Sequence, residues 1–154
     1  MSGPLIESLD SKKSRIKIII KRLRKIFPNV KCALNYETPF QLLVATILSA
    51  QCTDERVNKV TEVMFKKLKT PIDYVKVSQA KLEEYVHSAG FYRNKAKNIK
   101  AMAYMVLEKH AGELPRTMEE LVQLPGAGRK TANVVLGNAF GIPGMPVDTH
   151  MLRV

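Results

Sequence analysis

The residues best suited to chemistry lie near the end of the sequence, where a glycine turn precedes a lysine and a carboxylate follows. Lys130 comes two residues after the turn, at the start of a predicted helix, and Asp148 stands eighteen residues after Lys130. A lysine amine is nucleophilic only when it is partly unprotonated. The positive end of a helix dipole and the neighbouring Arg129 both disfavour the ammonium form. The pattern therefore allows a nucleophile at Lys130, although by themselves these residues are explained better by a surface lysine that contacts phosphate; Asp148 can act as an assisting carboxylate or as the cap of a following helix.

The turn itself, LPGAG, has the composition of an anion-binding site. Gly126 and Gly128 allow backbone N–H groups to converge on a phosphate. We expect Arg129, Thr131 and the backbone of Lys130 to contribute to the same contact. The alternative is a plain turn between two helices followed by a surface lysine, which needs only one glycine.

Helices must position these residues, because capping signals and apolar repeats with helical spacing recur along the chain. Thr38, Thr53, Ser78 and Thr117 each stand where they can cap a helix. The expected helices cover about 14–27, 38–48, 53–68, a short segment from 70, 78–90, 93–110, a short segment from 117, and 129–140. The apolar segment 42–48 is expected to be the central, buried helix. No segment alternates as a strand does, so the predicted fold class is all-α.

The charge balance favours a polyanionic partner. Lysine and arginine number 25 against 14 aspartates and glutamates, a formal net charge of +11. Neutralised phosphates release counterions, which drives binding to nucleic acid; the alternative is that surplus lysines only keep the protein in solution. We expect neither a membrane helix nor a signal peptide. Cys32 and Cys52 are too few for a disulfide framework, which favours a reducing, intracellular setting.

Four segments, taken in order, are similar to one known family. They are LSAQCTD at 48–54, GFYRNKAKNI at 90–99, LPGAGRKTANVVL at 124–136 and PVDTH at 146–150. Together they resemble the endonuclease III family of helix-hairpin-helix DNA glycosylases, and the resemblance runs from about Ile16 to the last residue. Four separate motifs are specific, whereas a lone glycine hairpin would not be.

The resemblance implies base-excision repair by a glycosylase that is also an AP lyase. In this family the lysine that Lys130 matches attacks C1′ of a damaged nucleotide and expels the base, and the Schiff base then permits β-elimination of the 3′-phosphate. The carboxylate that Asp148 matches stabilises positive charge on the sugar and assists proton transfer. The expected substrates are oxidised pyrimidines and abasic sites in double-stranded DNA. Two alternatives stay open: a monofunctional mismatch or base-specific glycosylase in which water attacks, and a non-catalytic DNA-binding module.

Two further residues on family motifs are candidates for contact with the DNA bases. An enzyme that extrudes a base from a duplex must fill the space left behind. Gln51 can hydrogen-bond the orphaned partner base, and Phe91 can wedge between bases, although burial in the core is an alternative for Phe91. Lys95 and Lys97 could reach phosphates or lie on a solvated helix face.

The resemblance also implies a domain division and a missing cofactor site. We expect a six-helix domain at 31–141 with the helix-hairpin-helix at about 119–140, and an incomplete second helical domain made of 1–30 and 142–154. Family members continue to four cysteines that hold a 4Fe–4S cluster, which two cysteines cannot do, so no cofactor or metal is expected here. A fragment of a longer protein, monomeric when full length and cytoplasmic or nucleoid-associated, is the simplest interpretation.

Overall fold

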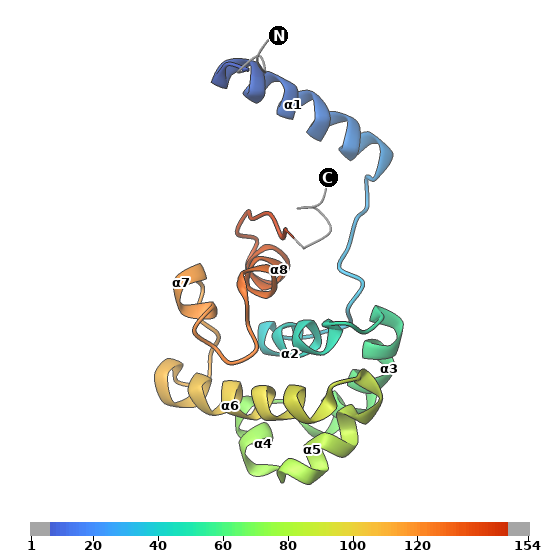
Figure 1. The fold of residues 1–154 in the computed structure, drawn as a ribbon, viewed down its shortest axis with the longest axis vertical. Coiled ribbons are helices and arrows are strands. Elements are labelled where there is room, and N and C mark those ends of the chain that lie inside the picture. Colours follow the sequence, from blue (N-terminus) through green and yellow to red (C-terminus); the bar gives the residue numbers. More distant parts are fainter. Residues whose placement is uncertain (1–6, 148–154) are drawn as a thin grey trace, which may run out of the picture. The chain divides into compact units, whose positions relative to one another are not determined.

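The computed structural model of this chain describes residues 7–147, and every regular element in that range is a helix (Figure 1). The all-α prediction is confirmed. The helices are α1 (Leu9–Ile26), α2 (Pro39–Ser49), α3 (Asp54–Lys67), α4 (Pro71–Lys76), α5 (Gln79–Val86), the short 3-10 helix η1 (His87–Ala89), α6 (Tyr92–His110), α7 (Met118–Leu121) and α8 (Arg129–Ala139). Backbone contacts divide the chain into two compact units, Met1–Cys32 and Ala33–Val154. The predicted domain limits stay a prediction.

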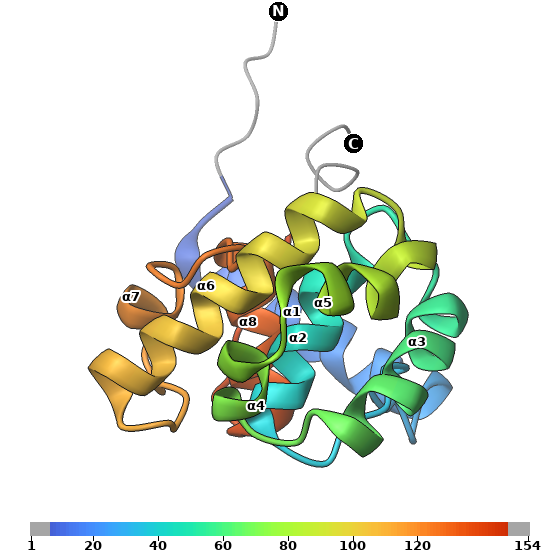
Figure 2. The ribbon, with the colours of Figure 1, turned by 90° about the horizontal axis from the view of Figure 1, so that it is seen from below.

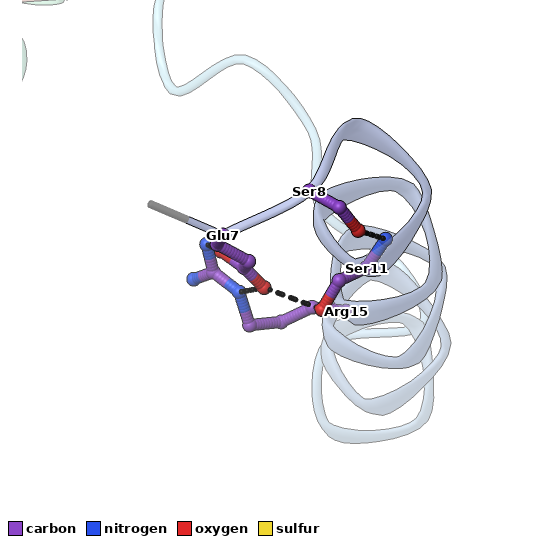
Figure 3. Close-up of polar contacts among 4 residues, drawn as sticks. All are labelled: Glu7, Ser8, Ser11 and Arg15. Carbon is purple, nitrogen blue, oxygen red and sulfur yellow. Dashed lines mark hydrogen bonds and ion pairs between the residues drawn. The ribbon is translucent and has the colours of Figure 1, made fainter. Parts of the chain in front are cut away.

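Helix α1 forms the first unit and begins five residues earlier than the sequence pattern predicted. The reason is a local cap: Ser8 Oγ accepts a hydrogen bond of 3.2 Å from the N–H of Ser11. Figure 3 shows the Glu7 carboxylate beside this cap, where it accepts from Ser11 Oγ at 3.0 Å and from Arg15 Nη2 at 2.7 Å. The hydrogen bond from Arg15 holds the pKa of Glu7 below its usual value. None of the α1 side chains is buried within this unit as the structure describes it.

Helix α2 is the buried centre of the second unit, as predicted. All side chains from Phe40 to Leu48 are buried, and α2 packs against α3, α6 and α8. The helix begins after Thr38, whose Oγ1 accepts from the Gln41 N–H at 3.2 Å, while Gln41 Oε1 accepts from the Glu37 N–H at 2.7 Å. Each fully buried leucine contributes about 1.5–3 kcal/mol. Helix α2 is therefore a firm support for the segments attached to it.

Helix α6 packs against α2, α4 and α5, and crosses the second unit in Figure 2. The residues that it buries recur at helical spacing and are Lys95, Ala96, Ile99, Met102, Ala103 and Val106. All but one of them are apolar, as expected for the core-facing stripe of a helix. Lys95 is the charged member of this stripe.

The short helix α4 is fixed by a capping carboxylate and a buried tyrosine. Asp73 Oδ2 accepts from the Thr70 N–H and hydroxyl, both at 2.8 Å, and from the Lys69 N–H at 3.0 Å. These hydrogen bonds, with that of the Thr70 N–H first, lower the pKa of Asp73. The ring of Tyr74 is fully buried and lies edge-on to Phe40, with ring centroids 5.2 Å apart. Burial raises the pKa of Tyr74, whose hydroxyl has no hydrogen-bond partner among residues 7–147.

Candidate nucleic-acid interface and active site

The glycine turn that the sequence singled out joins α7 to α8, two helices that pack against each other. Leu124 and Ala127 bury their side chains and so attach the turn to the core. The N–H of Ala127 donates to the carbonyl of Leu124 at 3.0 Å, which closes the turn tightly. Two helices and this turn place Lys130 in the first turn of α8, as predicted.

The two glycines of the turn are under different constraints. Gly126 has φ +82°, in the left-handed region, and a Cβ built there would lie 3.2 Å from the Asn98 Cβ and 3.4 Å from the Ile47 side chain. Gly128 has φ −81°, which any residue adopts, and a Cβ there would meet no atom of the described chain within 4 Å. The fold therefore requires glycine at Gly126 and leaves the space at Gly128 open.

The start of α8 combines backbone donors with basic side chains. Arg129 and Lys130 are exposed, and Thr131 is half-buried. Gly128 is the N-cap, so α8 has no side-chain cap in the structure described, and the first helical hydrogen bond runs from the Ala132 N–H to the Gly128 carbonyl at 2.9 Å. The N–H groups that precede this bond lie at the positive end of the helix dipole. This arrangement suits an anion held beside a lysine amine.

Gln51 and Phe91 lie on two loops of the same unit, the first after α2 and the second between η1 and α6. Both side chains are exposed; Phe91 is 72% exposed, so the alternative that it belongs to the core is wrong. Both residues also have positive φ, +53° for Gln51 and +46° for Phe91. Such values are uncommon outside glycine. The backbone at each loop therefore holds an exposed side chain in a costly conformation.

The turn packs against the two helices, α2 and α6, that adjoin these loops. The position of Gly126 is in contact distance of Ile47 on α2 and Asn98 on α6. The loop with Gln51 leaves the end of α2, and Phe91 comes directly before α6, so both loops adjoin the two helices that the turn approaches. The loop after α2 and the start of α6 lie close together at the upper right of Figure 2.

Lys95 is the residue on which the sequence-based expectation was wrong. It neither faces solvent nor reaches toward a phosphate, because its side chain is only 6% exposed. Its ammonium donates to the carbonyls of Leu48, at 2.8 Å, and Ala89, at 2.6 Å. Burial lowers the pKa of Lys95. Its spacing of four from Ile99, on the apolar stripe of α6, was the signal that could have predicted its burial.

The remaining expectations concern Asp148, a metal or cluster site, and a membrane helix. Asp148 lies outside the described residues, so its relation to Lys130 stays a prediction. Within residues 7–147 no group of three or more His, Cys, Asp or Glu side chains could hold a metal ion, and Cys32 and Cys52 are free. These residues do not fit a 4Fe–4S cluster, which needs four ligands. Of the helices described, none has the length and apolar character needed to cross a membrane.

Comparisons with curated proteins agree with the motifs. Endonuclease III of Synechocystis sp. is 52% identical over 151 residues, which make up 97% of this chain and 69% of the relative. Endonuclease III of Bacillus subtilis is 49% identical over 140 residues, 91% of this chain and 64% of the relative. The chain thus spans about two thirds of the length of these relatives.

Solved structures show the same fold. An endonuclease III in a non-covalent complex with DNA matches at a TM-score of 0.84 and 50% identity, over 92% of this chain and 66% of that one. A thermostable thymine-DNA glycosylase, 23% identical, shares the fold at a TM-score of 0.83 over 93% of this chain and 67% of that one. Residues 44–154 match the family model of the HhH-GPD superfamily base excision DNA repair proteins. The resemblance stated from the motifs is confirmed, and the chain belongs to the HhH-GPD superfamily of base excision DNA repair proteins.

Proposed function

We propose that this chain acts in base-excision repair as a bifunctional DNA N-glycosylase and AP lyase whose nucleophile is Lys130. The observation that carries the proposal is the exposed lysine in the first turn of α8, directly after a tight turn with open space at Gly128. An endonuclease III that is 50% identical to this chain has been solved as a trapped covalent intermediate with DNA, which supports covalent chemistry in this fold.

The proposed reaction begins with attack by the Lys130 amine on C1′ of the damaged nucleotide. The N–C1′ bond of lysine forms as the bond between C1′ and the base breaks, and the base leaves with the electron pair and takes up a proton. The sugar ring opens to give an imine between Lys130 and C1′. Loss of a proton from C2′ then breaks the bond between C3′ and its oxygen, so the 3′-phosphate leaves and the strand is cut. Water hydrolyses the imine and restores the lysine.

Asp148 and the turn assist this reaction in the proposal. The Asp148 carboxylate stabilises the positive charge that develops on the sugar and moves protons during ring opening. The phosphate next to the damaged nucleotide binds at the start of α8, where the backbone donors and Arg129 meet it. The absence of a side chain at Gly128 lets the DNA backbone come close. Thr131 adds a hydroxyl donor from the same turn of the helix.

Gln51 and Phe91 hold the DNA open in the same proposal. The target nucleotide must leave the stack before Lys130 can reach C1′, and the duplex then lacks one base. Gln51 hydrogen-bonds the orphaned partner base while the Phe91 ring occupies the gap between neighbouring bases. Their exposure, and their place on loops that adjoin the helices α2 and α6 approached by Gly126, support this role.

The proposed substrates and location rest on the resemblance to the endonuclease III family. Oxidised pyrimidines and abasic sites in double-stranded DNA are the proposed substrates, and association with the nucleoid is the proposed location. None of the proposed steps uses an iron–sulfur cluster, and the two cysteines of the sequence are fewer than the four ligands that a cluster requires.

Borohydride trapping tests the proposal directly. Duplex DNA with a single abasic site is incubated with the wild-type chain, with Lys130→Ala and with Lys66→Ala, a control that removes an exposed lysine of α3. A reduced covalent adduct is expected with the wild type and the control, and none with Lys130→Ala. No adduct with the wild type, together with removal of an oxidised pyrimidine from a second duplex by both the wild type and Lys130→Ala, would favour the monofunctional glycosylase. Salt-sensitive binding without any chemistry in the folded wild type would favour the binding module.

A further inference from the structure

One buried charge in the second unit has no part in the proposed chemistry. The Lys95 ammonium donates to the carbonyl of Leu48, in the last turn of α2, and to the carbonyl of Ala89, the last residue of η1. Leu48 precedes Gln51 by three residues, and Ala89 precedes Phe91 by two. A single side chain therefore joins the starts of the two loops that carry the proposed base contacts.

Both loops need such support, because each contains a residue with a costly backbone conformation. Three non-glycine residues in the described part of the chain have positive φ: Gln51, Phe91 and Ala111. Ala111 is explained locally, since it closes the C-terminus of α6 by donating to the Val106 carbonyl. The other two occur where Lys95 acts. Strained backbone persists only where surrounding contacts hold it.

The hydrogen bonds explain why a charge is buried at this point. The Leu48 carbonyl would normally accept from the N–H of residue 52 if α2 continued, but the Cys52 N–H donates to Ser49 instead, at 3.1 Å. An ammonium with three donors can serve this carbonyl and that of Ala89 together, which an apolar side chain cannot do. Since burial disfavours the charged form of Lys95, an apolar residue would fill this stripe of α6 at lower cost. The presence of a lysine at residue 95 is therefore better explained by its hydrogen bonds to the two loops than by packing of α6.

We infer that Lys95 is a positioning residue for base extrusion: it clamps the loops after α2 and before α6 so that Gln51 and Phe91 enter the duplex as one unit. This inference rests on the proposed function. It assigns Lys95 no contact with DNA and no role in the chemical step at Lys130.

A matched pair of variants on α6 separates this role from general stability. Lys95→Met keeps the length of the side chain and removes the donors. Lys100→Met is the control, because Lys100 also donates to a backbone carbonyl, that of Val77, but between α4 and α5 and away from both loops. Binding is measured to a duplex that contains a tetrahydrofuran abasic analogue and to the same duplex undamaged. Lys95→Met is expected to lower the preference for the damaged duplex by about tenfold, and Lys100→Met to leave it unchanged.

A double-mutant cycle tests whether Lys95 acts through the two loop residues. In a background of Gln51→Ala with Phe91→Ala, addition of Lys95→Met is expected to change the preference by less than about twofold. The same tenfold loss in both backgrounds would overturn the inference, because Lys95 would then act independently of the loops. No preference for damaged DNA in the wild type would contradict the proposed function and remove the basis of the inference with it.

Order in the loop can be measured without DNA. The sequence contains no tryptophan, so Phe91→Trp introduces a single tryptophan in the second loop, whose emission can be excited separately from that of the five tyrosines. Time-resolved anisotropy should show a larger amplitude of fast motion when Lys95→Met is added, and no change with Lys100→Met. If circular dichroism shows that Lys95→Met is unfolded, Lys95→Gln replaces it. The glutamine amide is neutral and shorter than the lysine side chain, so it can serve only one of the two carbonyls. Unchanged loop motion in a folded Lys95 variant would overturn the inference.

Discussion

Substitution of the two glycines in the turn before α8 distinguishes a residue that the fold needs from a residue that DNA is proposed to approach. At Gly126 an alanine must adopt a left-handed backbone, which costs about 1–2 kcal/mol. Its Cβ would also press on Asn98 at 3.2 Å and on Ile47 at 3.4 Å. Alanine also restricts the unfolded chain more than glycine does, which offsets about 0.4–1 kcal/mol of this destabilisation. Gly126→Ala is therefore expected to lower the free energy of unfolding by about 1 kcal/mol or more.

At Gly128 the same substitution should leave stability nearly unchanged. Its backbone suits alanine, and a Cβ there meets no described atom within 4 Å. Alanine lowers the entropy of the unfolded chain, which favours folding, but it caps a helix less well than glycine. The net change in the free energy of unfolding therefore stays within about 0.5 kcal/mol. The added methyl would instead stand where a phosphate is proposed to approach. Affinity for abasic duplex DNA should fall by about tenfold, and the slope of log K against log salt should become shallower by about one.

Urea unfolding followed by circular dichroism and DNA binding followed by fluorescence anisotropy measure the two effects. Wild-type stability in Gly126→Ala would refute the reasoning from the positive φ. Wild-type affinity and salt slope in Gly128→Ala would refute close approach of the DNA backbone at the start of α8. Loss of stability in both variants would show that the open space at Gly128 does not exist in solution.

Three predictions concern the support of this region. Tyr74→Phe removes a buried hydroxyl without a described partner and should raise the free energy of unfolding, by about 1 kcal/mol, in urea titrations; a loss of stability would show that the hydroxyl is hydrogen-bonded. Leu43→Ala, at a fully buried position of α2, should cost about 2–5 kcal/mol in the same assay, and a smaller loss would place Leu43 at an adaptable site. The pKa of Asp73 is lowered in the folded state, so its stabilising effect is present above the ordinary value of 3.8 and is lost as the pH falls through the lowered pKa. The wild type should exceed Asp73→Asn in stability at neutral pH, and the difference should shrink below about pH 4; a difference that stays constant on acidification would contradict this.

The sequence by itself determined the helices and the motifs of the candidate site. Caps such as Thr38 and apolar repeats such as that of α2 act within a few residues, so the local chain carries the information. The boundaries of α1 were less accurate, because Ser8 supplies a cap ahead of the apolar repeat. The placement of Lys130 in the first turn of α8 followed from the turn sequence alone.

Only the tertiary structure decided which residues around these motifs pack against the rest of the fold and which have open space beside them. Gly126 and Gly128 are alike in sequence, but contacts with α2 and α6 make one of them obligatory. Lys95 read as a surface lysine, yet its ammonium bonds a carbonyl 47 residues earlier in the chain. Local periodicity could place Lys95 on the buried stripe, but it could not say which carbonyls it would meet. Those contacts join segments distant in sequence, and they exist only once the helices have packed.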